Sequence, residues 1–209
     1  MDIVFATKNK GKLKEIKDVL ERSGGAFHVI SMEDAGITAD VAEDGDTYEA
    51  NAIKKAEAVC RLSNALTLAD DSGMEIDCLD KRPGVYSARY LGEHTPYAEK
   101  NRIILDEIAD VPDSKRTARY VCVIAAAFPG GGVYTTRGVI EGIIAREAGS
   151  GTTGFGYDPI FYLPEYGAAM SDISMELKNE ISHRGIALRK MKELLSDKRG
   201  DKNQTAGIQ

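Results

Sequence analysis

Cysteine is scarce in this 209-residue chain, and its few positions exclude two classes of protein. Cys60, Cys78 and Cys122 are odd in number, widely separated and set among apolar neighbours. That pattern fits neither a disulfide framework nor a cysteine metal site. We therefore expect three reduced thiols in the core of a cytoplasmic protein.

Long hydrophobic runs are also missing. The longest, from Val121 to Phe128, ends at Pro129 and falls far short of the ~18 apolar residues that span a bilayer. The first residues, Met1 to Phe5, lack the basic segment that opens a secretory signal. We expect neither a membrane span nor a secretory leader. With 43% hydrophobic and 29% charged residues, the composition is that of a globular protein.

An excess of positive charge is absent as well. The net charge of −6 argues against a broad face that binds a nucleic-acid backbone. Lysines nevertheless crowd residues 8–17, and a second basic group contains Lys178, His183 and Arg184. Local basic clusters on an acidic protein suit a small anionic ligand better than a polymer. For Lys14 and Lys17, a solvated helix face is an equally good interpretation.

The order of apolar patterns predicts an α/β fold with a mixed sheet. A strand at 3–6 leads into a helix at 13–20 that Gly24-Gly25 ends, and a later helix opens at Asp46. The β-rich runs 116–128 and 133–144 flank Pro129 and three glycines, which predicts an antiparallel hairpin. Further short strands are expected at 27–30, 66–69, 74–78 and 159–162, and further helices after Thr95-Pro96 and from Ile181.

Early βα units followed by a long hairpin predict helices flanking the sheet and two lobes with a cleft between them. We expect one catalytic domain over residues 1–196. Residues 197–209 are polar and lack periodicity, so they are expected to form a mobile tail.

The stretch from Leu66 to Gly73 runs from four strand-like residues into Asp70, Asp71 and Ser72. Because two buried neighbouring carboxylates would repel each other, we expect them where a strand emerges into a turn. A divalent cation would balance them, and oxygen ligands favour Mg²⁺ or Mn²⁺. The alternative is an ordinary turn, in which Asp, Ser and Gly are common.

Two glycine-containing turns are candidates for ligand binding. The turn from Thr7 to Lys12 joins a strand to a helix, and its free N–H groups and lysines favour an anion, although most such turns are plain connections. The loop 151–159 places Phe155 and Tyr157 among glycines, where an aromatic ring could stack on a flat heterocycle and Asp158 could accept from ring N–H groups. Both aromatics could instead fill the core.

A third polar segment, 178–185, holds Ser182, His183 and Arg184 in succession. The five donors of an arginine suit purine oxygens or phosphate. A lone histidine at a helix start is more often a capped surface residue than a catalyst. Neither Ser72 nor Ser182 has the setting of a nucleophile elbow.

Six segments in order resemble the inosine triphosphate pyrophosphatase family, whose members hydrolyse non-standard purine nucleoside triphosphates. The segments are Phe5 to Lys12, Glu49 to Ala56, Ala69 to Gly73, Pro83 to Tyr90, Gly154 to Pro159, and Lys178 to Gly185. The resemblance implies an elongated mixed α/β fold with a central active-site cleft and a homodimer. It also implies Mg²⁺-dependent cleavage (Mn²⁺ being a possible substitute) of XTP, ITP and dITP to a nucleoside monophosphate and pyrophosphate.

The resemblance also implies roles for individual residues. Asp71 would be the metal-linked general base, with Asp70 and Glu43 as further metal ligands. Thr7, Asn9, Lys12 and Lys55 would take the phosphate positions, and Phe155, Tyr157, Asp158, Lys178, His183 and Arg184 would form the base pocket. Further substrate-binding residues would be Lys8, Lys10, Gly11, Ser72 and Gly156.

Two other functions stay open. A pyrimidine triphosphate diphosphatase of similar fold is disfavoured by the segments around Phe155 and Arg184. A nucleotide-sensing module without hydrolysis is disfavoured by Asp70 and Asp71, because a pure binder gains nothing from carboxylates that face a triphosphate.

Overall fold

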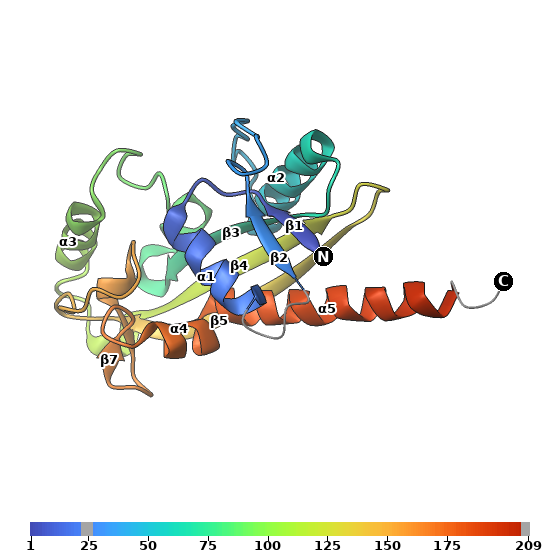
Figure 1. Cartoon of the computed structure of the whole chain (residues 1–209). Coiled ribbons are helices and arrows are strands. Elements are labelled where there is room, and N and C mark those ends of the chain that lie inside the picture. The colour runs from blue at the N-terminus through green and yellow to red at the C-terminus, as the bar shows by residue number, and fades with distance from the viewer. Residues whose placement is uncertain (22–26, 206–209) are drawn as a thin grey trace.

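One seven-stranded mixed sheet forms the centre of the fold, in the order β2-β1-β3-β4-β5-β6-β7 (Figure 1). The computed structural model describes residues 1–21 and 27–205, with side chains for all of these except 199–205. The strands are β1 (Asp2–Phe5), β2 (His28–Ser31), β3 (Thr67–Ile76), β4 (Thr117–Ala127), β5 (Val133–Ile144), β6 (Phe161–Leu163) and β7 (Ala168–Ala169). β1 pairs in parallel with β2 and β3, and the pairs from β3 to β7 are antiparallel, which confirms the predicted mixed sheet.

Helices cover both faces of this sheet. They are α1 (Lys10–Glu21), α2 (Tyr48–Ser63), α3 (Tyr97–Glu107), α4 (Met175–Ile181) and α5 (His183–Thr205). Because strand side chains alternate between faces, Ile3 and Phe5 pack with α1 and α5, whereas Val4 and Ala6 pack with α2. α1 and α5 therefore share one face, and α2 covers the other.

A separate apolar cluster lies toward the other end of the sheet. It joins Met74 and Ile76 of β3 to Ile104 of α3 and Phe161 of β6. All three cysteines are free thiols, and Cys60 and Cys122 are buried, as predicted, whereas Cys78 is half-buried. Within the described residues, no helix is long and apolar enough to cross a membrane.

Several element boundaries differ from the sequence prediction. The α2 helix is capped by Thr47, whose hydroxyl accepts from the Ala50 amide, so the predicted opening at Asp46 was one residue early. The single helix predicted from Ile181 is two helices, because the backbone at Ser182 is extended. α5 continues to Thr205, beyond the boundary expected at residue 196, and the predicted tail beyond 205 lies outside the described residues. The predicted end of the first helix, at Gly24-Gly25, also lies outside the described residues.

Candidate active site

The site lies where β1 ends and β3 continues with only β4 as its neighbour. β1 pairs with β3 only through Val4–Thr67 and Phe5–Leu68, so from Asp70 to Met74 that edge of β3 has no strand partner, and a β-bridge to Pro83 follows at Glu75. Side chains cover the free edge instead. Lys55 donates to the Asp70 carbonyl at 2.5 Å, and the Ser87 hydroxyl accepts from the Met74 amide at 3.0 Å. Two backbone groups of this open edge, the Asp70 carbonyl and the Met74 amide, are thus paired with side chains.

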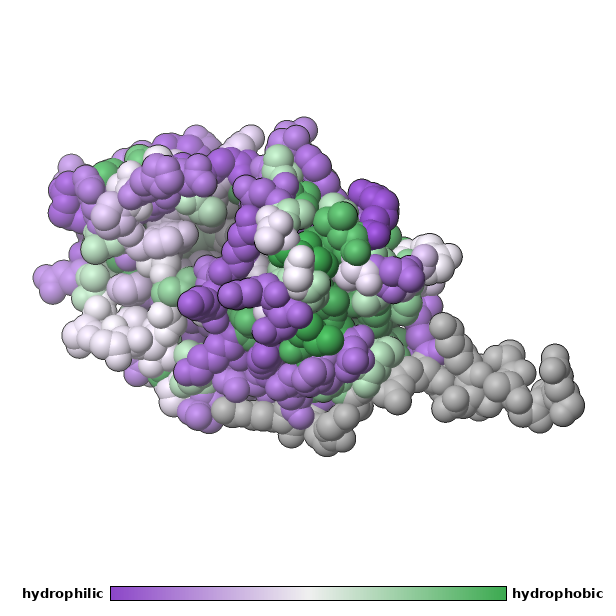
Figure 2. All heavy atoms as spheres, turned by 45° about the horizontal axis from the view of Figure 1, so that its top comes forward, coloured by the Kyte–Doolittle hydropathy of each residue, from purple (hydrophilic) through white to green (hydrophobic). Residues whose placement is uncertain are grey.

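A pocket of ≈ 310 Å³ opens beside this edge. Figure 2 shows a recess on the face turned to the viewer, bordered by hydrophilic side chains. Most of the predicted site residues line the pocket: Thr7, Lys8, Asn9, Lys12, Glu43, Lys55, Ser72, Phe155, Gly156, Tyr157, Asp158, Lys178, His183 and Arg184. Segments far apart in the sequence therefore meet at one cavity.

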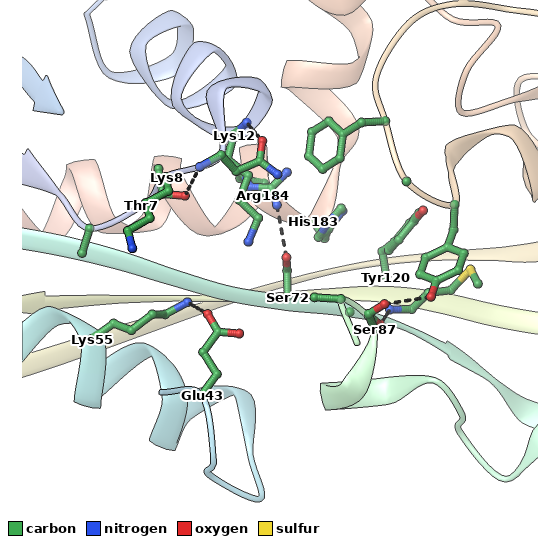
Figure 3. A pocket seen from close by; sticks show the side chains of 18 of the residues that line it. Thr7, Lys8, Lys12, Glu43, Lys55, Ser72, Ser87, Tyr120, His183 and Arg184 are labelled. Atoms are coloured by element: carbon green, nitrogen blue, oxygen red, sulfur yellow. Dashed lines mark hydrogen bonds and ion pairs between the residues drawn. The ribbon is translucent and has the colours of Figure 1, made fainter. Parts of the chain in front are cut away.

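Asp70 and Asp71 lie inside β3, and the prediction that they mark a turn at a strand exit was wrong. Their side chains are 1% and 4% exposed. Neighbouring residues of a strand point to opposite faces, so the two carboxylates are separated by the sheet and each finds its own partners. In Figure 3, Lys12 and Arg184 lie on one side of β3, and Lys55 and Glu43 lie on the other.

The carboxylate of Asp70 is held by two cations on the α1–α5 face. Lys12 Nζ lies 2.9 Å and Arg184 Nη2 lies 3.3 Å from its Oδ2. Burial by itself opposes the charged form, but Lys12 and Arg184 outweigh it and keep the pKa of Asp70 well below its usual range. Asp70 is thus a permanent anion that fixes two pocket cations.

Asp71 on the α2 face is less well compensated. Its Oδ2 accepts from the Asn51 amide at 2.9 Å, and its Oδ1 accepts from the Ser72 backbone amide at 2.9 Å. Burial raises the pKa of Asp71 to about 6, with nearby Glu43 adding to the rise and Lys55 opposing it. A carboxyl group with such a pKa is ionised at neutral pH and remains a competent proton acceptor.

Lys55, whose positive charge opposes the rise in the pKa of Asp71, contacts the loop before α2. Its ammonium group contacts Glu43 as well as the Asp70 carbonyl. The side chains of Lys55 and Glu43 both line the pocket. Within residues 1–21 and 27–205, no group of three or more His, Cys, Asp or Glu side chains is arranged to hold a metal ion. Asp71 and Glu43 are nevertheless two oxygen donors in electrostatic contact, and Mg²⁺ commonly uses one or two carboxylates with substrate phosphates and water. The residues therefore fit a substrate-completed Mg²⁺ site.

The turn after β1 presents cations at the start of α1. The Asn9 side chain accepts from the Lys12 amide at 3.1 Å and so caps the helix, while the Thr7 hydroxyl accepts from the Asn9 amide at 3.2 Å. Lys8 pairs with Asp40 across the pocket mouth at 3.0 Å. Two predicted residues of this turn do not line the pocket. Lys10 is exposed, and Gly11 packs against Phe155, where a Cβ atom would lie 3.0 Å from the ring.

The glycine-rich loop gives its two aromatics different surroundings. Phe155 is half-buried at the pocket, with Lys178 Nζ 5.1 Å and the Arg184 guanidinium 5.7 Å from its ring centre. Tyr157 is 3% exposed, belongs to the apolar cluster around Ile76, and donates its hydroxyl to the Ser87 carbonyl at 2.8 Å. Phe155 thus suits stacking, and Tyr157 combines a pocket wall with core packing.

The Asp158 carboxylate holds this loop in place through three hydrogen bonds. It accepts from Lys178 at 2.7 Å, from the Phe155 amide at 2.8 Å and from the Tyr120 hydroxyl at 3.2 Å. Burial raises the pKa of Asp158 despite the nearby Lys178. Three donors already occupy the carboxylate, so it positions the loop more than it offers a free acceptor. Gly154 permits this approach with a φ of +84°.

His183 and Arg184 begin α5 and face the pocket. His183 is 5% exposed and stacks on Tyr120 with ring centres 4.6 Å apart, so the alternative of a capped surface histidine was wrong. Burial keeps the pKa of His183 well below its usual value, so the ring is neutral. Gly138 of β5 lets α5 approach, because a Cβ there would lie 2.1 Å from the His183 carbonyl.

Sequence reasoning missed several residues that build the site. Asn51, Ser87 and Tyr120 contact Asp71, Tyr157 and Asp158, respectively. Asn51 and Ser87 lie within the quoted family segments, which was the available signal, whereas Tyr120 lies in a strand that was interpreted only as core. Glu15 was also missed, because it sits in a lysine-rich stretch typical of a surface helix.

Comparison with known proteins agrees with the geometry. The family model described as "Ham1 family" matches residues 3–194. The chain is 47% identical over 196 residues to a dITP/XTP pyrophosphatase of Desulforamulus reducens, covering 94% of this chain and 96% of that protein. It is 44% identical over 194 residues to the dITP/XTP pyrophosphatase of Bacillus subtilis, covering 93% and 96%.

Solved structures show the same similarity. The Ham1 protein of Staphylococcus aureus superposes with a TM-score of 0.82 at 36% identity, covering 95% of this chain and 100% of that one. A HAM1 protein from Coxiella burnetii gives a TM-score of 0.84 at 37% identity, covering 94% and 99%. Matches of this extent in both sequence and structure establish that the chain belongs to the Ham1 family.

Proposed function

We propose that this protein hydrolyses XTP, ITP and dITP to the nucleoside monophosphate and pyrophosphate, and so removes non-standard purine nucleotides from the cellular pool. The curated relatives at about 45% identity are named dITP/XTP pyrophosphatases. One observation carries the proposal. A single pocket joins a cationic turn at the start of α1 to an aromatic and cationic wall at the start of α5. The Asp71 carboxylate, whose pKa is about 6, does not itself line the pocket but accepts from the amide of Ser72, which does.

The triphosphate would occupy the end of the pocket near β1. Thr7, Asn9 and the amides of the following turn offer donors at a helix N-terminus, where the helix dipole favours anions. Lys8, Lys12 and Lys55 would neutralise the non-bridging oxygens, on which charge grows during phosphoryl transfer. Ser72, on the free edge side of β3, would contact the substrate between the two ends.

The purine would occupy the other end. The half-buried ring of Phe155 provides a stacking surface, and Lys178 and Arg184 keep two positive charges near that ring. Buried donors there favour a 6-oxo purine, because the amino group of adenine would leave them unpaired. His183, neutral and stacked on Tyr120, completes the wall.

Asp71 would act as the general base. A water molecule transfers a proton to the carboxylate as its oxygen bonds to one phosphorus of the α–β bridge. The bond from that phosphorus to the bridging oxygen breaks. If water attacks the α-phosphorus, pyrophosphate leaves with the bridging oxygen and the electron pair of the broken bond; if water attacks the β-phosphorus, the nucleoside monophosphate keeps both. No covalent intermediate is required.

We assign the divalent cation, Mg²⁺ or Mn²⁺, to Asp71 and Glu43 together with the triphosphate. When bound, it would supply Lewis-acid neutralisation of phosphate charge. Asp70, the third predicted ligand, has both of its cations on the opposite face of β3, so its role here is to hold Lys12 and Arg184. We also propose that the protein is a homodimer and is cytoplasmic. Light scattering of the purified protein tests the homodimer.

Pyrophosphate release tests the function. XTP, ITP, dITP, GTP, ATP and dTTP are each supplied with Mg²⁺, with Mn²⁺, or with a chelator. We expect release from the first three with Mg²⁺, weaker support by Mn²⁺, and none with chelator. Preference for dTTP would identify a pyrimidine enzyme. Tight binding of ITP without any release would identify a sensing module, and release of orthophosphate would place cleavage at the wrong bond.

A further inference from the structure

Glu15 is a buried carboxylate on the helix that starts at the phosphate end of the pocket. It lies in α1, three residues after Lys12, and is 3% exposed. A carboxylate so deeply buried requires charged partners, because an unpaired one would be strongly destabilising. Both of its partners come from the opposite end of the chain.

The two oxygens of Glu15 contact two different cations of the base-binding wall. Arg184 Nη1 donates to Oε2 at 2.5 Å, and Lys178 Nζ lies 2.9 Å from Oε1. These side chains start α5 and belong to α4, respectively. One carboxylate therefore fixes the spacing of two cations that would otherwise repel each other.

Each of these cations has a second anchor, and together the groups form a balanced network. Arg184 Nη2 also reaches Asp70 at 3.3 Å and Ser72 at 3.1 Å, and Lys178 also donates to Asp158 at 2.7 Å. Three buried or half-buried cations thus meet three buried carboxylates: Lys12, Lys178 and Arg184 with Glu15, Asp70 and Asp158.

The partners of Arg184 also determine which of its donors remain for a ligand. Glu15 and Asp70 engage Nη1 and Nη2, while Nε is buried and has no hydrogen-bond partner in the described part of the chain. His183 Nδ1, in the same pocket wall, is also buried and has no hydrogen-bond partner in the described residues. Buried polar atoms without partners at a pocket are typical of a place where a ligand completes the pairing.

We infer that Glu15 is a positioning residue for recognition of the purine base, although it lies on the phosphate-binding helix. Its carboxylate sets the positions of Arg184 and Lys178, so that the remaining donors are held in one place. The inference rests on the proposed function. It assigns Glu15 to the base end specifically, because the carboxylate is paired with Arg184 and Lys178, whereas Lys12 is paired with Asp70.

Glu15→Gln removes the charge and keeps the shape. The matched control is Glu21→Gln in the same helix, whose carboxylate accepts from the Val29 amide at 2.9 Å and does not line the pocket. Three quantities are measured for each protein at a temperature where circular dichroism shows it folded. They are kcat/KM for ITP, kcat/KM for ATP, and inhibition by inorganic tripolyphosphate, which has phosphates and no base.

For Glu15→Gln we expect the ITP-over-ATP ratio to fall by about tenfold or more, because the donors lose their fixed positions. Inhibition by tripolyphosphate should weaken by less than about twofold, since the phosphate cations keep their own anchors. Glu21→Gln should change neither quantity. An unchanged ratio in Glu15→Gln overturns the inference, and so does an equal weakening of tripolyphosphate inhibition, which would place Glu15 at the phosphate end.

A second variant covers the case in which Glu15→Gln does not fold. Glu15→Asp keeps the charge but draws the carboxylate back by one methylene, so it cannot reach both cations, and the ratio should fall by about threefold or more. A wild-type ratio in that variant overturns the inference. Wild-type activity is measured before any variant is compared. Failure of the wild-type protein to release pyrophosphate from any purine triphosphate would contradict the proposed function instead of the inference about Glu15.

Discussion

Asp70 and Asp71 are adjacent in β3, yet the sheet separates their carboxylates and gives them opposite electrostatic settings. Lys12 and Arg184 make Asp70 a fixed anion, whereas Asp71 accepts hydrogen bonds from Asn51 and Ser72 and has a pKa of about 6. A single strand thus supplies an anchor on one face and a proton acceptor on the other. A negative charge therefore stabilises the folded protein at Asp70 and destabilises it at Asp71.

Neutralising these two residues should change stability in opposite directions. The pKa of Asp70 is lowered in the folded protein, so its contribution is present above the unfolded pKa and lost as the pH falls through the folded one. Asp70→Asn should therefore lower stability at pH 7, by about 3–5 kcal/mol, because Lys12 and Arg184 lose a buried partner.

For Asp71 the sign is reversed. Its folded pKa is raised, so it favours the folded state below the unfolded pKa and this benefit is lost as the pH rises through about 6. Asp71→Asn should raise the stability of the ligand-free protein at pH 8 by on the order of 1–2 kcal/mol, and the gain should vanish near pH 4. Urea unfolding of both variants at pH 4, 6 and 8 tests the pair, and changes of the same sign at pH 8 would contradict it.

The same Asp71→Asn variant should be nearly inactive. Loss of a general base lowers kcat by ~10²–10⁴, while the affinity for substrate changes little because the phosphate cations remain. Steady-state pyrophosphate release from ITP gives both parameters. Near-normal turnover would remove Asp71 from the base role and make Glu43 the next residue to test.

Lys12 and Lys8 should differ although both line the phosphate end. Lys12 pairs with buried Asp70, so Lys12→Ala should raise KM, lower kcat and also lower the melting temperature. Lys8 pairs with an exposed Asp40, and such pairs contribute little, so Lys8→Ala should raise KM with a nearly unchanged melting temperature. If Lys12→Ala changes only the melting temperature, Lys12 is a structural residue and contacts no phosphate.

Arg184 should determine discrimination between 6-oxo and 6-amino purines. Arg184→Ala should reduce ITP activity sharply and narrow the ITP-over-ATP preference more than the ITP-over-GTP preference, because guanine shares the 6-oxo group. Arg184→Lys keeps the buried charge for Glu15 and Asp70 but loses the planar fork, so it separates recognition from folding. Measured kcat/KM values for ITP, GTP and ATP decide the matter, and intact activity with both preferences unchanged would show that Arg184 does not contact the base.

Local signals in the sequence were enough for most of the fold. The glycine-rich connection after Pro129 predicted the β4–β5 hairpin, and the early βα units together with that hairpin predicted a mixed sheet. The two-residue strand β7 carried no such signal, since Ala168 and Ala169 have little strand preference and pair only with β6.

The site was less predictable because its electrostatics are non-local. The sequence around Asp70 predicts a turn instead of a buried strand position, because the cations that permit its burial lie 58 residues earlier, at Lys12, and 114 later, at Arg184. Glu15 shows the same effect in reverse: its neighbours in the sequence are lysines, but its partners are Lys178 and Arg184. The family segments identified the residues, but pairing between them requires the fold.

The contact between Glu15 and Arg184 spans 169 positions of the chain, which has a consequence for biosynthesis. Closing so long a loop costs chain entropy, and this cost is offset only once other native contacts have formed. While α5 is still unmade, Glu15 and Asp70 lack the guanidinium that compensates their burial, so the sheet cannot close around them at low cost. The nucleotide pocket and the native fold should therefore mature in one late step, and a chain that stops before α5 should neither bind nucleotide nor resist proteolysis.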